Sequence, residues 1–265
     1  MTTVCTLASG SSGNALVLSC ESTHLLVDAG ISCRRITAGL RALGLEPEDL
    51  SAILITHTHK DHISGLQTLL KRTAAPLCAT AYACGALSQH LLEAEHRLSA
   101  LALCRPVFLE EVSVTAFPTS HDSPGSCGFR FDTPDGGVGV LTDTGYVTEE
   151  AADILPGVSL AVLESNYDEE SLRSGPYPYY LKRRILGDEG HLCNEDAARF
   201  AVTLAQHGAA EIILAHLSRE NNTPAMAENA VAAALSAASL QPLLSVAPRS
   251  AMGEVHAVRR ALCKR

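Results

Sequence analysis

The sequence predicts an α/β fold in which β-sheets are covered by helices. Short apolar runs bounded by turn residues recur along the chain, as strands do, and longer segments with helical character lie between them. Hydrophobic residues make up 46% of the 265 residues and charged residues 18%, a balance that supports a substantial core and excludes global disorder. Strands with helices between them are typical of layered α/β domains, and because neither a repeat nor a low-complexity linker interrupts the pattern, we expect one domain over residues 1–265.

The first half of the chain is rich in predicted strands. Ser32–Leu43 has helical character and ends at Gly44. The buried strand Ala52–Thr56 is followed by a polar turn and by a helix that runs through Lys71. The remaining predicted elements of this half are strands, namely Leu16–Leu18, His24–Val27, Val112–Phe117, Gly128–Phe131 and Val138–Leu141.

The second half alternates between strands and helices. A helix is expected over Asn194–His207, with Asn194 as its N-cap. Another begins after Thr223, a suitable N-cap that is followed by proline at the first helical position, and runs to about Ser236. The strands of this half are Leu160–Leu163, Ile212–Leu214 and Leu243–Val246.

Charge and targeting features restrict the class of protein. The chain has 29 acidic and 20 basic residues, a net charge of −9, which argues against a generally basic nucleic-acid coat. Met1–Leu7 lacks the basic residues and the apolar region of a signal peptide, and the uncharged stretch Ala230–Pro248 contains polar residues and a proline that favour a helix followed by a strand over a membrane span. Nine scattered cysteines without a C-x-x-C pair are typical of reduced structural thiols. We therefore expect a cytoplasmic protein without a membrane segment.

The most informative segment is the strand that runs into His57-Thr-His59-Lys-Asp61-His62. Three of the 11 histidines fall within these six residues, directly after an apolar strand. Imidazole and carboxylate groups are ligands that suit zinc, manganese and iron, so the segment predicts a metal site. A chance cluster of histidines on a solvated loop is the alternative.

Three further candidates follow later strands, namely His121, Asp143 and His216. Each alone could be an ordinary turn or core residue. Together with the first segment they place potential ligands at the ends of four strands, which can converge on one edge of an α/β structure.

In this order of motifs the chain resembles the metallo-β-lactamase superfamily over nearly its whole length. The resemblance implies a four-layer αββα sandwich with two divalent metal ions at one edge of its two sheets. It implies that His57, His59 and His121 hold one ion, that Asp61, His62 and His216 hold the other, and that Asp143 bridges both. Asp28 matches an aspartate that supports the ligands from behind. The ions are expected to be zinc or manganese, with iron as a further option.

Within the superfamily, several features narrow the resemblance. An aspartate at position 143, where lactam-hydrolysing members commonly have cysteine, argues against a β-lactamase. Glu164 and His191 resemble the Glu–His pair of tRNase Z-type phosphodiesterases, in which the carboxylate orients an imidazole that donates a proton to the leaving oxygen. Segments such as S-G-S-S-G-N-A from Ser9, L-T-D-T-G-Y and H-L-S-R-E-N-N-T-P are similar to the YycJ/WalJ branch. That branch implies a cytoplasmic 5′-to-3′ exonuclease acting on double-stranded DNA.

The hypothesis from the sequence is therefore a dinuclear metal phosphodiesterase, in which a metal-bound hydroxide attacks phosphorus. Asp61, His191 and Glu164 are its expected catalytic residues, with Asp61 both binding metal and helping to deprotonate the water. The basic run Lys182, Arg183 and Arg184, preceded by Tyr180, combines charge and an aromatic face and is a candidate contact for DNA, although a solvated helix face would look the same. Two alternatives stay open: a thioester or lactone hydrolase of glyoxalase II type, and a non-catalytic scaffold that binds nucleic acid or a regulatory partner.

Overall fold

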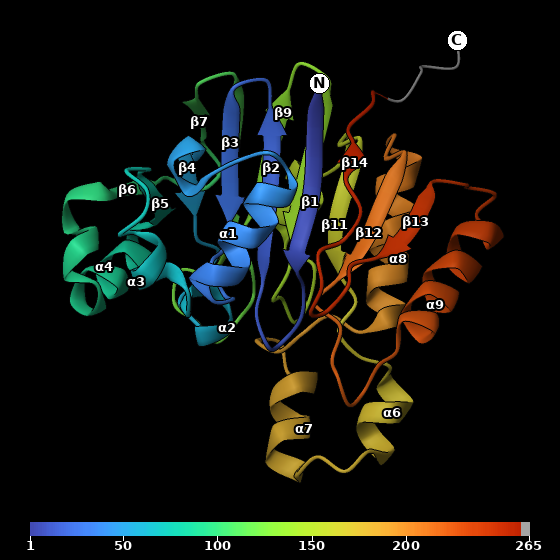
Figure 1. Cartoon of the computed structure of the whole chain (residues 1–265). Coiled ribbons are helices and arrows are strands. Elements are labelled where there is room, and N and C mark those ends of the chain that lie inside the picture. The colour runs from blue at the N-terminus through green and yellow to red at the C-terminus, as the bar shows by residue number, and fades with distance from the viewer. Residues whose placement is uncertain (261–265) are drawn as a thin grey trace.

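The computed structural model describes residues 1–260, and within them the strands form two seven-stranded sheets (Figure 1). The first sheet has the order β14-β1-β2-β3-β4-β5-β6, and the second has the order β13-β12-β11-β10-β9-β8-β7. Each sheet is antiparallel on one side and parallel on the other, with the change at β3–β4 in the first sheet and at β10–β11 in the second. The strands of the first sheet are β1 (Thr2–Ala8), β2 (Ala15–Cys20), β3 (Thr23–Val27), β4 (Ala52–Leu54), β5 (Leu77–Thr80), β6 (Leu98–Leu101) and β14 (His256–Ala257). Those of the second are β7 (Pro106–Leu109), β8 (Val112–Pro118), β9 (Cys127–Thr133), β10 (Gly136–Leu141), β11 (Leu160–Glu164), β12 (Glu211–Ala215) and β13 (Leu243–Val246).

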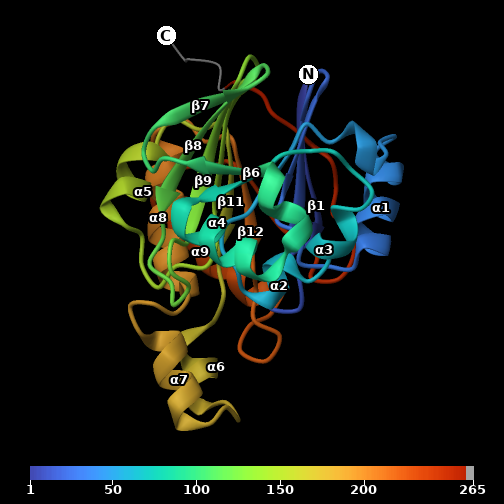
Figure 2. The same ribbon diagram turned by 90° about the vertical axis from the view of Figure 1, so that its left-hand side faces the viewer.

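The two sheets pack face to face, and helices cover their outer faces (Figures 1 and 2). Side chains alternate between the two faces of a strand, so Leu16 and Leu18 enter the core between the sheets while Val17 enters the core under the helices. Helices α1 (Cys33–Ala42), α3 (Leu66–Leu69) and α4 (Ala81–His90) lie on the first sheet. Helices α5 (Glu149–Ile154), α8 (Asn194–Gln206) and α9 (Pro224–Ala237) lie on the second. The predicted four-layer αββα sandwich is confirmed.

Most of the predicted elements occur close to their expected bounds, and two details differ. The helix expected through Lys71 is split into α2 (Lys60–Ile63) and α3 at Gly65, because the Gly65 N–H donates to the Ala29 carbonyl oxygen while the Asp61 carbonyl oxygen accepts from the Asn14 N–H. The N-cap of α8 is Cys193, whose Sγ accepts from the Asp196 N–H, whereas Asn194 was expected. The Asn194 side chain is instead buried, where its oxygen accepts from the Ser165 hydroxyl. Thr223 caps α9 as predicted.

Helices α6 (Glu169–Ser174) and α7 (Tyr179–Leu186) extend beyond the lower edge of the sheets in Figures 1 and 2. They share a small apolar cluster of their own that includes Leu172 and Ile185. We call residues 168–187 the α6–α7 arm. Short 3₁₀ turns at Pro47–Asp49 and Leu92–Arg97 complete the described helical elements.

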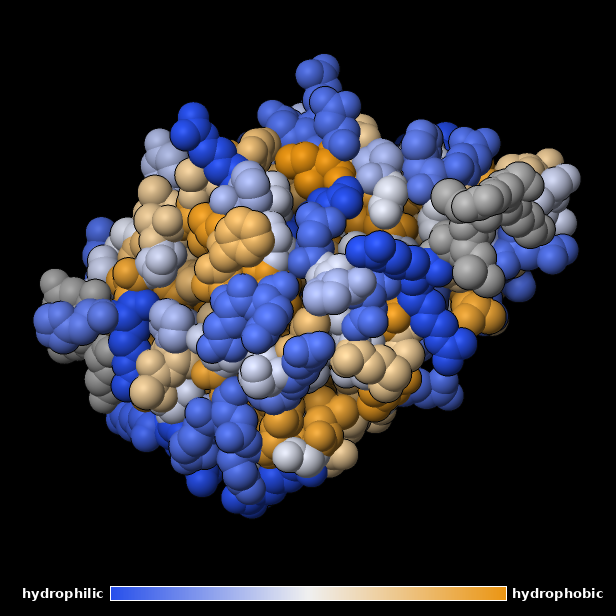
Figure 3. All heavy atoms as spheres, turned by 90° about the horizontal axis from the view of Figure 1, so that it is seen from above, coloured by the Kyte–Doolittle hydropathy of each residue, from blue (hydrophilic) through white to orange (hydrophobic). Residues whose placement is uncertain are grey.

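The opposite end of the sandwich, seen in Figure 3, has hydrophilic and hydrophobic side chains interspersed. Eight cysteines lie in the described part of the chain and are free thiols, as expected, whereas Cys263 lies outside it. Across residues 1–260, the helices are all too short or too polar to cross a membrane.

Candidate metal centre

The segment after β4 supplies four candidate ligands because a tight turn and one helical turn follow the strand directly. His59 is the N-cap of α2, and Asp61 and His62 lie within that short helix. The turn is fixed from behind: the Asn14 N–H donates to the Asp61 carbonyl oxygen at 2.8 Å, and Gly30 lies so close to that oxygen that a Cβ would be 1.6 Å from it. Any side chain at position 30 would therefore displace the turn that carries Asp61.

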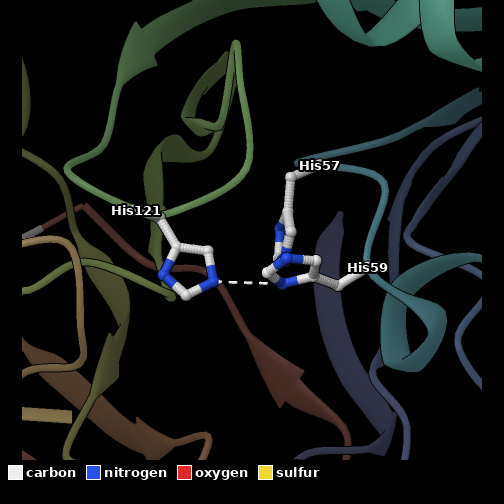
Figure 4. A group of neighbouring side chains, drawn as sticks. All are labelled: His57, His59 and His121. Carbon is white, nitrogen blue, oxygen red and sulfur yellow. Dashed lines mark hydrogen bonds between the residues drawn. The ribbon is translucent and has the colours of Figure 1, made fainter. Parts of the chain in front are cut away.

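The first candidate group consists of His57, His59 and His121, which Figure 4 shows facing one another. His121 follows β8 of the second sheet, so the group joins residues of both sheets. His121 Nε2 lies 3.2 Å from His59 Nδ1, and one nitrogen of each histidine lies within 4.8 Å of the others. The structure thus brings together the three residues expected around one ion.

The second candidate group consists of Asp61, His62 and His216, with Asp143 beside it. His62 Nε2 lies 3.3 Å from Asp143 Oδ2 and 3.6 Å from Asp61 Oδ2, and His216 Nε2 lies 3.6 Å from the same Asp61 oxygen. Asp143 also groups with His57 and lies 3.8 Å from His121 Nε2, so it stands between the two groups as a bridging ligand would. All seven predicted ligands meet at one edge of the sandwich.

Each of the five candidate histidine ligands has one ring nitrogen engaged by a partner outside the group. Such outer partners fix the ring and its tautomer, so that the other nitrogen is free to bind a metal. The pairs are His57 Nδ1 with Thr56 Oγ1 (3.0 Å), His59 Nε2 with Asp122 Oδ1 (3.4 Å), His62 Nδ1 with Asp28 Oδ2 (2.7 Å), His121 Nδ1 with the Gly190 carbonyl (3.1 Å) and His216 Nδ1 with Glu164 Oε1 (3.0 Å). Asp28 thus contacts a candidate ligand from outside the group, and its supporting role stays a prediction.

The donor atoms that face one another fit a metal ion. His57 Nε2, His216 Nε2 and Asp143 Oδ2 are buried and have no hydrogen-bond partner among the described residues. A buried polar atom without a partner costs free energy, and a divalent cation bound by nitrogen and oxygen ligands would remove that cost. Asn14 Nδ2 lies 3.0 Å from His62 Nε2 and would have to give way to an ion there.

The electrostatics of the centre also suit cation binding. Burial lowers the pKa of His57 well below its ordinary value, so this imidazole is neutral at pH 7. Burial opposes ionisation of Asp143, but the imidazoles of His216 and His62 outweigh it and hold the pKa of this carboxyl well below its ordinary value. Burial also favours neutral His62, but Asp28 and Asp143 raise its pKa to about 10. In the absence of metal, the carboxylates are therefore neutralised by protons on imidazoles.

Three of the seven non-glycine residues with a positive φ in the described part of the chain belong to this centre. Asp28, Asp143 and His216 have φ values of +61°, +57° and +55°, in the left-handed region that residues other than glycine rarely adopt. Each of the three follows a strand, namely β3, β10 and β12. Strain of this kind persists where the surrounding structure fixes it, and it is common at functional sites.

Glu164 and His191 contact each other and lie beside the second candidate group. Glu164 ends β11, is fully buried, and its Oε1 accepts from His191 Nδ1 at 2.8 Å as well as from His216 Nδ1. Its Oε2 accepts from the backbone N–H groups of Thr144 (2.9 Å) and Leu192 (3.3 Å). Glu164 and His191 also form a possible ligand group with Asp143 and His216, but both oxygens of Glu164 are already occupied, which favours a supporting role.

The predicted DNA contacts lie on α7 of the α6–α7 arm. The Tyr180 ring and the Arg183 side chain are exposed. Lys182 Nζ donates to the Arg173 carbonyl oxygen at 2.7 Å, and Arg184 Nε lies 2.5 Å from Asp122 Oδ2. Arg184 is therefore connected with the metal centre through Asp122, and two of the three members of the basic run have partners within the protein.

Sequence reasoning missed four members of the centre: Thr56, Asn14, Asp122 and Gly190. Asp122 directly follows His121, and Thr56 directly precedes His57, so adjacency to a ligand was the available signal. Asn14 lies in the glycine-rich turn that connects β1 with β2. Nothing in the sequence marks the Gly190 carbonyl as a partner of His121.

Comparison with known proteins agrees with this geometry. Residues 23–217 match the family described as Beta-lactamase superfamily domain. The chain is 38% identical over 237 residues to exodeoxyribonuclease WalJ of Streptococcus pneumoniae, covering 88% of each chain, and 36% identical to exodeoxyribonuclease YycJ of Bacillus anthracis, covering 86% of this chain and 87% of the relative.

Two solved structures show the same fold. The metallo-β-lactamase fold protein YhfI from Bacillus subtilis superposes with a TM-score of 0.72 at 16% identity, over 96% of this chain and 98% of YhfI. The short form of human tRNase Z superposes with a TM-score of 0.65 at 18% identity, over 97% and 99% of the two chains.

Proposed function

This chain belongs to the beta-lactamase superfamily and is a metal-dependent hydrolase, and from that premise we propose that it is a 5′-to-3′ exonuclease that acts on double-stranded DNA. The observation that carries the proposal is the meeting of seven histidine and aspartate ligands beside the Glu164–His191 pair. Relatives named exodeoxyribonucleases that align over most of the chain support DNA as the substrate class. We further propose that residues 1–265 form one domain, and cytoplasmic location stays a prediction.

The proposed ligands of the first ion are His57, His59 and His121, those of the second are Asp61, His62 and His216, and Asp143 bridges them. When bound, the two ions would lower the pKa of a shared water and neutralise charge on the phosphate oxygens. Zinc, manganese and iron all suit this set of donors.

The protein's own groups then have distinct tasks in the proposed reaction. Asp61 is less buried than Asp143, the other carboxylate among the proposed ligands. It faces His62 and His216, where it can accept a proton from the attacking water. His191 is partly exposed at its ring, so that Nε2 can donate a proton to the leaving oxygen of the cleaved bond. Glu164 accepts a hydrogen bond from His191 Nδ1 and so fixes the orientation of this imidazole.

We also propose that α7 contacts the DNA. Tyr180 offers an aromatic face for stacking and Arg183 a cation for phosphate, and both are exposed. Lys182 and Arg184 would reach a phosphate only by exchanging their present partners, Arg173 and Asp122.

The test uses metal-stripped protein reloaded separately with zinc, manganese or iron(II). Linear duplexes labelled at either the 5′ or the 3′ end, a covalently closed circular duplex, single-stranded DNA, RNA and S-lactoylglutathione are offered as substrates. We expect early release of the 5′ label from linear duplex, no cleavage of the circle, and loss of activity in Asp61→Asn but not in Asp153→Asn, which changes an exposed carboxylate on α5. Faster cleavage of the thioester, release from the 3′ end, or wild-type activity in Asp61→Asn would overturn the proposal.

A further inference from the structure

A chain of polar contacts connects the α6–α7 arm with the first candidate metal group. Arg184 Nε on α7 lies 2.5 Å from Asp122 Oδ2. The other oxygen of that carboxylate lies 3.4 Å from His59 Nε2 and 3.6 Å from His121 Nε2. Asp122 therefore stands between a cation of the arm and two of the proposed ligands.

His59 differs from the other candidate histidines in its support. The outer partners of His57, His62, His121 and His216 are all buried groups, whereas Asp122 is about one quarter exposed (27%). His59 is itself 33% exposed, while the other four rings are almost fully buried. Its position thus depends less on packing and more on the one carboxylate that faces its Nε2.

The ring orientation of His59 also differs from the others. It directs Nδ1 toward His121 Nε2, and Nε2 toward Asp122. An imidazole whose Nε2–H donates to a carboxylate keeps the lone pair on Nδ1, and a ring held in this way is a stronger and better oriented metal ligand. Asp122 can do this only while its own carboxylate is held in place, and in the structure Arg184 holds it.

We propose that Asp122 is a positioning residue for His59, that Arg184 acts through Asp122, and that the α6–α7 arm and the first metal position are thereby energetically coupled. The inference rests on the proposed metal centre, but not on the identity of the substrate. Coupling between two sites is reciprocal, so filling the metal centre must also favour the docked position of α7.

The first experiment measures metal affinity by competition with a chelator in wild-type protein and variants. We expect Asp122→Asn to weaken binding of one of two metal equivalents by about 10–100-fold, the usual effect of losing an outer partner of a ligand, and to leave the other equivalent unchanged. Arg184→Gln should weaken the same equivalent by a smaller factor, and Arg184→Lys by less again. Arg183→Gln removes the same charge from the neighbouring position, where no ion pair occurs among the described residues, and should leave the affinity for both metal equivalents unchanged.

Two further measurements separate positioning from general damage. The visible spectrum of the cobalt(II)-loaded protein should change in Asp122→Asn and Arg184→Gln and stay as in the wild type in Arg183→Gln. Because Arg184 acts through Asp122, Arg184→Gln should have no further effect in the Asp122→Asn background. Metal loading should slow hydrogen exchange in residues 179–186 of the wild type, but not of Asp122→Asn.

Equal weakening of both equivalents, equal effects of Arg183→Gln and Arg184→Gln, or additive effects in the double variant would each overturn the inference. The urea midpoint of the metal-free variants shows whether they fold. If the protein binds two metals and the variants show the expected pattern of metal affinities, but DNA is not cleaved, the proposed function is wrong and the inference is supported. If DNA is cleaved but Asp122→Asn binds both metals as tightly as the wild type, the inference is wrong and the proposed function is supported.

Discussion

The buried carboxylate of Glu164 decides which nitrogen of His216 is available to a metal, and Glu164→Gln tests this directly. The wild-type side chain accepts four hydrogen bonds, two from imidazoles and two from backbone N–H groups. The N–H groups of Thr144 and Leu192 can only donate, so the oxygen of the new amide must face them and its NH₂ must face the rings. His191 and His216 then have to accept at Nδ1, which places their protons on Nε2.

The size of the effect follows from this exchange of tautomers. For His216 Nε2 to bind an ion, its proton must return to Nδ1, where it faces the amide NH₂ and one buried donor is left unpaired. That costs about 1–3 kcal/mol, which corresponds to roughly 5- to 150-fold weaker binding of the second metal equivalent. In the metal-free variant the groups around position 164 keep their hydrogen-bond partners, and the His216 Nε2 proton faces Asp61 Oδ2 at 3.6 Å, so the variant should remain folded.

Titration of metal-stripped protein against a competing chelator measures this change, and urea unfolding of the metal-free form checks the fold. Glu211→Gln is a matched control, because Glu211 accepts from His256 Nδ1 at 2.6 Å at the start of β12, the end of the sheet opposite to Glu164. Wild-type affinity for both equivalents in Glu164→Gln would refute the tautomer argument. So would an equal loss of affinity in Glu211→Gln.

Three further predictions concern the turn, the pH dependence and the leaving group. Gly30→Ala should lower the free energy of unfolding in urea by about 1–3 kcal/mol and weaken metal binding, because the new Cβ would meet the Asp61 carbonyl. The control is Gly85→Ala in α4, where a Cβ meets nothing within 4 Å, and it should be neutral or stabilising in the same assay. Metal affinity should rise by at least about tenfold per pH unit between pH 7 and 9, because His62, with its pKa raised to about 10, must lose a proton to bind the metal. Metal titrations at several pH values measure this, and an affinity that does not change with pH would contradict it. His191→Ala should slow DNA cleavage by about 10²–10⁴-fold but slow the hydrolysis of a p-nitrophenyl phosphodiester far less, because p-nitrophenolate leaves without a proton. Equal losses of the two activities in steady-state kinetics would exclude the proton donor role.

The proximity of the seven proposed ligands was predictable from the sequence because these residues are marked locally. Four candidates lie in one short segment after a strand, and His121, Asp143 and His216 each follow a strand that ends at the same edge. The strand positions were predictable for the same reason, since apolar runs such as Val138–Leu141 are buried on both faces.

What the sequence could not supply depends on contacts between distant segments. At the split between α2 and α3 the Gly65 N–H donates to the Ala29 carbonyl oxygen, and neither residue alone predicts that contact. The contact between Arg184 and Asp122 joins residues 62 positions apart, and the basic run looked like a free surface patch until the structure placed this partner beside it. Left-handed backbone at Asp143 has no marker in an otherwise ordinary turn sequence.

The proposed ligands come from both sheets, and this division affects how the protein unfolds. His57, His59, Asp61 and His62 follow β4 of the first sheet, whereas His121, Asp143 and His216 follow strands of the second. Ions held by both sets would join the two halves of the sandwich across their shared core, so separating the sheets would require breaking metal–ligand bonds first. The metal-loaded protein should therefore unfold much more slowly than the stripped form, and its lifetime against proteases that cleave the opened state should depend on how quickly a chelator can remove the ions.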